Sequence, residues 1–370
     1  MPSRSLLARI GVSRLALIGG LDRSGVQVAC ATRPRGHILQ VSNGKGLTEE
    51  QALWSAAMEA AELWASERVP QDVAWFEPPT SAEAWGPGTL PASARLRPDA
   101  LWPAAKRRPW ARARELRTER GIWVPAASVW CNPPGSGGVP DLGIAWTSNG
   151  LGAHPADGNR ALRHALLELV ERDLLTRALP GGWTRDRIGE TAVDRQALEA
   201  TPRVEALVGW LASGGLEAML FDLDPPPRRG VVALPVAGAL VFDTVREAVP
   251  VTAGYAAGVS REEARLGALT EAAQSRLTDI HGAREDVAPG AVADAAVLLE
   301  AARGKRRASP RKRATPTTIG STDAGDAGPV LRALGNAGYT RIAVVELASA
   351  GEGAVVVKAF VPGLRLSELL

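Results

Sequence analysis

Hydrophobic and polar positions repeat a common pattern three times along the chain. Residues 52–62, 161–171 and 264–274 align without gaps and share the pattern A-x-x-(S/H/G)-A-x-x-E-x-x-(E/E/Q), at offsets of 109 and 103 residues. Each segment is rich in alanine and leucine and follows residues with helix-capping spacing, which are Thr48 with Gln51, Asp157, and Ser260 with Glu263. The pattern predicts three equivalent helices.

Extended runs precede the helices. Residues 26–32 and 37–42 lie before the first helix and residues 249–253 before the third, with glycine-containing segments at 43–46, 149–152 and 254–258 between run and helix. Glycine favours turns, so the recurring unit is predicted to be strand, turn, helix. A further buried strand is expected at residues 218–223, ahead of three consecutive prolines. The chain is therefore expected to adopt an α/β fold with pseudo-threefold repeats.

One face of each predicted helix carries conspicuous acids. At about 100° per residue, Ser55, Glu59 and Glu62 share a face, as do Glu168 and Glu171. No Lys or Arg occurs between Lys45 and Arg68, so the first acidic pair has no local countercharge. A single such pair is usually a solvated helix surface. Its recurrence at the same phase of distant helices instead favours a Mg²⁺ site, because this cation prefers carboxylate oxygens and completes its shell with water and phosphate.

Composition limits the number of domains and the kind of protein that the chain can be. The 370 residues are 45% hydrophobic with a net charge of +3, which is enough apolar material for one large domain or two ordinary ones. Two cysteines with no metal-ligand spacing favour neither a disulfide scaffold nor a zinc site, and a reducing cytoplasm is expected. The N-terminal apolar run is too short for an export signal or a membrane span.

Two segments stand out as irregular. Residues 78–110 hold seven prolines and are expected to form a long excursion, and a basic run at 303–313 follows a predicted helix at 291–302. A run of like charge is usually a solvated loop, although contact with phosphate or an acidic peptide is the alternative. Nucleic-acid binding is not expected, because aromatic residues do not alternate with the basic ones.

Familiar nucleotide-binding motifs are missing from the chain, but a series of short motifs occurs in the order found in one protein family. No GxxxxGK[ST] or GxGxxG pattern occurs. The chain resembles the YcaO family, whose members use ATP to modify backbone amides of ribosomal peptides. The resemblance rests on GVSR at 11–14, RP at 33–34, GKG at 44–46, SxxxExxE at 55–62, ExxER at 168–172, QSR at 274–276, GARED at 282–286, and Lys358 with PG at 362–363. It implies a single α/β domain over residues 1–370, with an ATP site between helices.

The resemblance also assigns roles residue by residue. It implies that the magnesium ligands are Glu59, Glu62, Glu168 and Glu171. It implies nucleotide contacts for Ser55, Arg172, Gln274 and Arg276, with Arg284, Lys45 and Arg14 as further candidates. Three alternatives stay open. Arg172 could pair with Glu168 on its own helix, Arg276 projects about 140° away from Glu271 on an ideal helix, and Lys45 could simply be exposed.

In the family that the chain resembles, the product depends on which nucleophile attacks the activated amide. A Cys, Ser or Thr side chain of the substrate gives an azoline, whereas external sulfide gives a thioamide, usually with a TfuA-type partner. Azoline-forming members end in a Pro-x-Pro-x-Pro tail, but residues 361–370 read VPGLRLSELL. This difference, with the runs at 274–276 and 282–286, favours thioamidation. A TfuA-like or peptide-recognition partner is expected to deliver the precursor peptide, and a homodimer is compatible with the resemblance. The alternative of another class is a non-catalytic nucleotide-binding adaptor.

Overall fold

Three antiparallel sheets and three long helices build the molecule. The computed structural model describes residues 1–70, 73–77, 85, 107–133, 139, 143–245, 249–284 and 325–365. Most of the proline-rich stretch, the basic run at 303–313, the predicted helix at 291–302 and the end of the chain at 366–370 lie outside the described residues. Within the described part, no helix is both long and apolar enough to cross a membrane.

The strands divide among the sheets as follows. The first sheet has the order β1 (Arg14–Leu17), β2 (Gln27–Thr32), β3 (Val41–Gly46). The second has the order β10 (Val251–Ala257), β9 (Val236–Asp243), β8 (Leu216–Asp222). The third has the order β4 (Ala74–Phe76), β5 (Arg108–Glu115), β11 (Ala343–Ala348), β12 (Val355–Phe360), β7 (Leu151–His154), with β6 (Gly121–Pro125) paired to β5.

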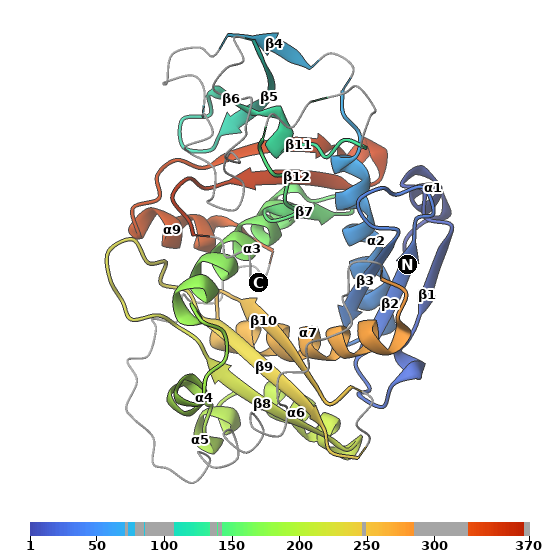
Figure 1. Cartoon of the computed structure of the whole chain (residues 1–370), viewed down its shortest axis with the longest axis vertical. Coiled ribbons are helices and arrows are strands. Elements are labelled where there is room, and N and C mark those ends of the chain that lie inside the picture. Colours follow the sequence, from blue (N-terminus) through green and yellow to red (C-terminus); the bar gives the residue numbers. More distant parts are fainter. Residues whose placement is uncertain are drawn as a thin grey trace.

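Each sheet packs against one of the three long helices. These are α2 (Glu49–Ser66) on β2 and β3, α3 (Gly158–Ala178) on β7 and β12, and α7 (Arg261–His281) on β9 and β10. Each helix also touches a strand of a neighbouring sheet in cyclic order, α2 with β7, α3 with β10 and α7 with β3. Figure 1 shows the resulting ring, with the three helices facing a common centre. The pseudo-threefold arrangement expected from the repeat is therefore present.

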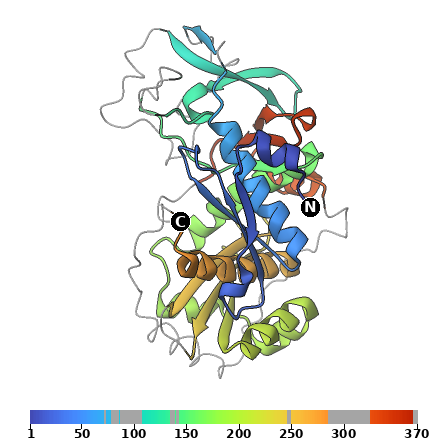
Figure 2. The same ribbon diagram turned by 90° about the vertical axis from the view of Figure 1, so that its right-hand side faces the viewer.

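Shorter helices flank this ring. They are α1 (Arg4–Arg9), α4 (Arg185–Thr191), α5 (Arg195–Glu199), α6 (Pro202–Ser213) and α9 (Gly328–Asn336). Figure 2 shows β4, β5 and β6 at one end of the elongated molecule and α4 to α6 at the other. Cys30 and Cys131 are free, as their separation in the sequence predicted.

The predicted helix starts are confirmed. Thr48, Asp157 and Ser260 are the N-caps, and their side chains accept hydrogen bonds from backbone N–H groups in the first turn of α2, α3 and α7. These caps use only residues within one turn of each other, which explains why the sequence revealed them.

The role of the glycines differs from the prediction. Gly44 and Gly254 lie inside β3 and β10, and Gly152 lies inside β7. Residues 43–46, 151–152 and 254–257 of the predicted turns are therefore strand. A Cβ at these positions would lie 1.9 Å from Ala56 N, 2.2 Å from Ala272 N and 2.1 Å from Ala161 O, respectively. The glycines are therefore needed because a strand and a helix backbone touch. The repeated alanines Ala52, Ala56, Ala161, Ala165 and Ala268 belong to the helix side of that contact, and Ala272 lies one turn further along α7.

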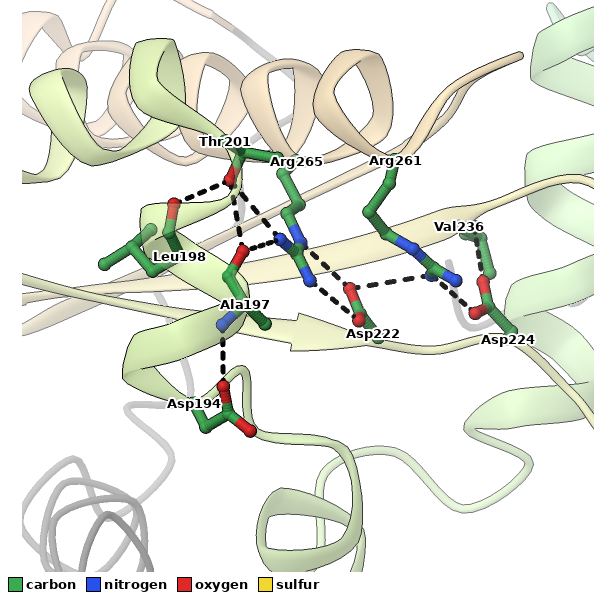
Figure 3. Close-up of polar contacts among 9 residues, drawn as sticks. All are labelled: Asp194, Ala197, Leu198, Thr201, Asp222, Asp224, Val236, Arg261 and Arg265. Atoms are coloured by element: carbon green, nitrogen blue, oxygen red, sulfur yellow. Dashed lines mark hydrogen bonds and ion pairs between the residues drawn. The ribbon is translucent and has the colours of Figure 1, made fainter. Parts of the chain in front are cut away.

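A buried ionic network fixes the start of α7 (Figure 3). The Arg265 guanidinium donates to both carboxylate oxygens of Asp222 at 3.1 and 2.9 Å, and to the carbonyl of Ala197 at 2.7 Å. One turn earlier, Arg261 pairs with Asp224, which also accepts the Val236 N–H at 2.9 Å. The network ties α7 to β8, β9 and the α5–α6 segment, and so sets where the cavity-facing residues of α7 lie.

Replacing Gly44 by alanine tests the strand–helix contact. The new methyl group would collide with backbone atoms of α2, which cannot rotate away, so we expect Gly44→Ala to lower the free energy of unfolding by on the order of 2 kcal/mol or more. Chemical denaturation measures this. The control is Gly209→Ala on the exposed face of α6, where a Cβ meets nothing within 4 Å and stability should be unchanged or higher. Equal stabilities of Gly44→Ala and wild type would contradict the packing.

Candidate active site between three helices

A cavity of about 1260 Å³ lies between α2, α3 and α7. Its walls hold nine of the eleven residues assigned to the site from the sequence, namely Lys45, Ser55, Glu59, Glu62, Glu168, Glu171, Arg172, Gln274 and Arg284. Segments more than two hundred residues apart in sequence thus meet at one place, as the repeat predicted. The acidic faces of the helices point inward rather than to bulk solvent.

Free strand edges hold several of these side chains in place. The Gly150 N–H donates to Glu168 at 2.9 Å, and the Tyr255 N–H donates to Glu271 at 3.5 Å. On the third strand, the Gln274 side-chain amide donates to the Asn43 carbonyl at 2.7 Å. The inner edges of β7, β10 and β3 therefore bond to side chains from the helices, which orients those side chains before any ligand arrives.

Glu62 lies in the more crowded acidic group, with Glu59 and Glu168. Burial raises the pKa of Glu62 well above its usual range, and the neighbouring charges of Glu168 and Glu59 raise it further. A hydrogen bond from the Ala153 backbone and the positive charge of Lys358 oppose this shift. Arg284, just beyond α7, approaches Glu59 at 3.9 Å. The countercharge that is missing from the local sequence is thus supplied from distant parts of the chain, but only in part.

Lys358 is a buried cation beneath this group. It is 2% exposed on β12, and its ammonium donates to the carbonyls of Thr147 and Asn149 and lies over the Trp146 ring. Burial lowers the pKa of Lys358 to about 8, against the opposing effect of Glu168 and Glu62. Its hydrogen bonds shape the segment that presents the Gly150 N–H to Glu168. Lys358 is among the residues on which the family resemblance rests, but the sequence did not predict its hydrogen bonds to this segment.

Glu171 belongs to a second acidic group on the same wall. Burial raises the pKa of Glu171 to about 8, and Glu271 contributes the next largest effect in the same direction. Arg172 lies 3.8 Å from Glu171, and Lys45 forms an ion pair with Glu271 at 2.6 Å. The sequence left Lys45 open as a phosphate contact or an exposed residue; it is half-buried in β3 and paired. The ion pair of Arg172 is with Glu171, not with Glu168 as the alternative supposed.

Two predicted residues lie elsewhere. Arg276 is 3% exposed on the far side of α7, where it donates to Asp22 at 3.1 Å, to Asp243 at 2.8 Å and to the Val249 carbonyl at 2.6 Å. Arg276 therefore does not line the cavity that holds most of the other predicted nucleotide contacts, which agrees with the angle that separates it from Glu271 on the helix. Arg14 is exposed on β1 and does not line the cavity.

Glu271 lines the cavity, although the sequence assignment did not include it. It occupies the third-repeat position equivalent to Glu59 and Glu168, so the repeat itself contained the signal. It lines the cavity beside Glu171, Lys45 and Tyr255. The acidic wall therefore draws on all three helices rather than two.

The donor set fits a hard cation that is bound together with phosphate. Among the residues that the structure describes, no three His, Cys, Asp or Glu side chains converge as a complete metal site. Mg²⁺ seldom needs one, because it usually takes one or two carboxylates and completes its octahedron with water and phosphate oxygens. Burial is the main cause of the raised pKa values of Glu62 and Glu171, and the neighbouring carboxylates add to it.

The chain is similar over nearly its whole length to proteins of one family. The family model described as YcaO cyclodehydratase, ATP- and Mg²⁺-binding, matches residues 43–365. An uncharacterized protein in the tfuA 3′ region of Rhizobium leguminosarum bv. trifolii is 30% identical over 378 residues, which cover 98% of this chain and 86% of the relative.

Two solved structures share the fold. YcaO from Methanopyrus kandleri, bound with AMPPCP and Mg²⁺, matches with a TM-score of 0.66 at 24% identity, covering 98% of this chain and 88% of that one. The E. coli microcin synthetase McbBCD complex with pro-MccB17 bound matches with a TM-score of 0.62 at 14% identity, covering 98% of this chain and 90% of the matched chain.

Burial, together with the neighbouring charge of Glu271, makes stability depend on pH through Glu171. Its pKa is about 8 in the folded protein against 4.5 ordinarily, so between these values the folded state keeps a proton that the unfolded state releases. Stability should therefore fall as pH rises from about 4.5 to about 8, and then level off. Glu171→Gln removes this loss. We expect its melting temperature at about pH 8 to exceed that of the wild type by a few degrees, for a gain on the order of 1–2 kcal/mol.

Thermal melting of both proteins at a series of pH values measures the difference. Glu205→Gln, on the exposed face of α6, is the matched control and should keep the wild-type slope. A slope that is unchanged in Glu171→Gln would show that this carboxyl is not held protonated by its surroundings.

Proposed function

The chain belongs to the YcaO family, and from this premise we propose that it phosphorylates a backbone amide oxygen of a ribosomally synthesised peptide. Family membership confirms the resemblance, the assignment to ATP-dependent peptide-modifying enzymes, and the use of ATP and Mg²⁺. It does not favour the adaptor, and neither does a cavity that retains all four predicted glutamates. The product, the partner and the role of each side chain belong to the proposal.

One observation carries the proposal: carboxylates from three helices face one cavity with too little fixed countercharge. Bound Mg²⁺ would be held by Glu59, Glu62, Glu168 and Glu171, with Glu271 as a fifth candidate, and would neutralise the phosphates of ATP. The hydrogen bonds from Gly150 to Glu168 and from Tyr255 to Glu271 keep these groups oriented. Little reorganisation is then needed when the ligands bind.

The cationic and polar side chains of the cavity are assigned to the nucleotide. Arg172 and Lys45 bring positive charge next to the carboxylates. Ser55 and Arg284 offer further donors from α2 and from the end of α7. The amide nitrogen of Gln274 is bonded to Asn43, so its carbonyl oxygen is the group that remains for a ligand. These residues would position the transferring phosphoryl group, which is the main task in this chemistry.

Phosphorylation makes amide substitution possible. An amide oxygen is a poor leaving group, so a nucleophile that adds to the carbonyl carbon is readily expelled again. When sulfide adds, the carbonyl oxygen attacks the terminal phosphorus of ATP and ADP leaves. The C–O bond then breaks, phosphate departs, the sulfur loses its proton to solvent and the C=S bond forms. Amide, hydrogen sulfide and ATP thus yield thioamide, ADP and phosphate.

Thioamide formation with a TfuA-like partner is the branch that we favour. Its support is the relative named for the tfuA 3′ region, which is similar along almost all of this chain. Peptide delivery by a partner is supported by the microcin synthetase, which is a multiprotein complex with pro-MccB17 bound. The cavity volume of about 1260 Å³ exceeds the range of roughly 300–1,000 Å³ for small-molecule pockets. It therefore has room for a nucleotide and a peptide segment together.

Azoline formation is the second candidate. The observation in its favour is the family description itself, which names a cyclodehydratase. The same phosphorylation would serve this reaction, with a Cys, Ser or Thr side chain of the substrate as the nucleophile and loss of the amide oxygen as phosphate. The two candidates differ only in the source of the nucleophile.

ATP binding should require a divalent cation. Without it, the carboxylates repel the phosphates, so we expect calorimetry to detect tight binding with Mg²⁺ and at least about a 100-fold loss in EDTA, a difference of roughly 3 kcal/mol. Glu59→Gln and Glu168→Gln should bind much more weakly in the presence of Mg²⁺, while Glu205→Gln should match the wild type. Equal ATP affinity with and without Mg²⁺ would refute the cation site.

The product follows from a mass measurement. Reconstitution with a candidate precursor, a TfuA-like partner, Mg-ATP and sulfide should add roughly 16 Da to the precursor, the mass difference between sulfur and oxygen when an external nucleophile is used. The reaction without sulfide should leave the mass unchanged. A loss of roughly 18 Da in that sulfide-free reaction would identify the azoline route instead.

A further inference from the structure

Tyr255 follows a strand glycine that touches a helix backbone. It follows Gly254 on β10, as Lys45 follows Gly44 on β3 and Ala153 follows Gly152 on β7, and all three of these residues line the cavity. Lys45 uses this position to place a charge next to Glu271. Tyr255 places a phenol there, on the same wall as Glu271, to which its own N–H donates.

The phenol is held by Trp183, which lies in the connection after α3. The indole N–H of Trp183 donates to the Tyr255 hydroxyl oxygen at 2.8 Å, and the two rings stack with 18° between their planes. Trp183 is itself fixed, because its ring packs on Phe221 at 4.7 Å between centroids and a Cβ at Gly238 would lie 3.1 Å from it. The direction of the tyrosine hydroxyl is thus set by a rigid neighbour.

This arrangement leaves the hydroxyl as a donor. The indole N–H can only donate, so the phenol oxygen must accept from it, and the phenol proton must point elsewhere. Among the residues that the structure describes, the hydroxyl of Tyr255 makes no hydrogen bond besides the one from Trp183. Arg172 shares this wall, and its Nε is buried without a hydrogen-bond partner in the described part of the chain. The free hydroxyl proton of Tyr255 and the guanidinium of Arg172 are thus two donors next to carboxylates suited to Mg²⁺, which together form a site for phosphate oxygens.

We propose that Tyr255 contacts the phosphate chain of bound Mg-ATP through its hydroxyl proton, and that Trp183 is a positioning residue that fixes the direction of this bond. The assignment rests on the proposed nucleotide site and adds a neutral donor to its charged ones. A phenol donates to phosphate without a net positive charge, so it helps bind an anion without competing with the cation for the carboxylates.

Calorimetry with Mg-AMPPCP tests the assignment. Tyr255→Phe keeps the ring and removes only the hydroxyl, so the affinity should fall about 10-fold or more, as for the loss of one hydrogen bond to a charged group. Trp183→Phe keeps a ring against Phe221 but loses the N–H, and should weaken binding about 3-fold. The double variant should bind like Tyr255→Phe alone, because the indole acts only through the hydroxyl. If the two substitutions acted only through packing, the changes in melting temperature of the single variants would add up in the double variant.

Tyr339→Phe is the matched control. This is the other tyrosine of the chain, and its hydroxyl donates to the Gly230 carbonyl and accepts from Arg177 outside the cavity. Its nucleotide affinity should equal that of the wild type. An affinity of Tyr255→Phe within twofold of the wild type, independent losses from the two aromatic variants, or an equal weakening of adenosine binding would each overturn the phosphate contact. Absence of Mg-AMPPCP binding by the wild type would instead overturn the nucleotide site as a whole, and this assignment with it.

Discussion

The contact between a strand glycine and a helix backbone, made three times, is the constraint on which the site depends. Because Gly44, Gly152 and Gly254 have no side chain, each strand reaches the main chain of its helix. That contact consumes the alanine face of the helix. The face with glutamate or glutamine lies beside the alanine face on each helix, and in the ring the three acidic faces meet around one cavity. A packing requirement thus determines the direction of the chemical groups.

Electrostatics in the cavity are balanced only in part by the protein itself. Strand-edge N–H groups, Lys358, Lys45 and Arg172 offset some of the carboxylate charge. Burial and the remaining carboxylate repulsion together raise the pKa values of Glu62 and Glu171. Such a site stores an unfavourable energy in the absence of ligand, and a divalent cation with phosphate relieves it. The same imbalance therefore connects the pH dependence of stability with the function proposed for the family fold.

Helix α7 shows how remote ion pairs support this arrangement. Its outer side carries Arg261, Arg265 and Arg276, which pair with aspartates of β8, β9 and the segment after β1. Its inner side carries Glu271 and Gln274, which meet β10 and β3. A buried arginine whose donors are all used fixes a helix at a definite rotation, since any other rotation would strand a buried charge. The helix is thus held from both sides in the orientation that the cavity needs.

The sequence by itself determined the features that depend on neighbours within a few residues. The three capped helices, their alanine faces and the clustering of Glu59, Glu62, Glu168 and Glu171 on one face all follow from helical periodicity, and the repeat joined them into one site. Only the tertiary structure decided how the glycines act, where Arg276 belongs, and that Lys358 and Trp183 support the cavity. Those facts depend on partners far along the chain, as with Arg276 and Asp22, 254 residues apart. Periodicity gives the direction of a side chain from its own helix, but its partner is set by how sheets and helices pack.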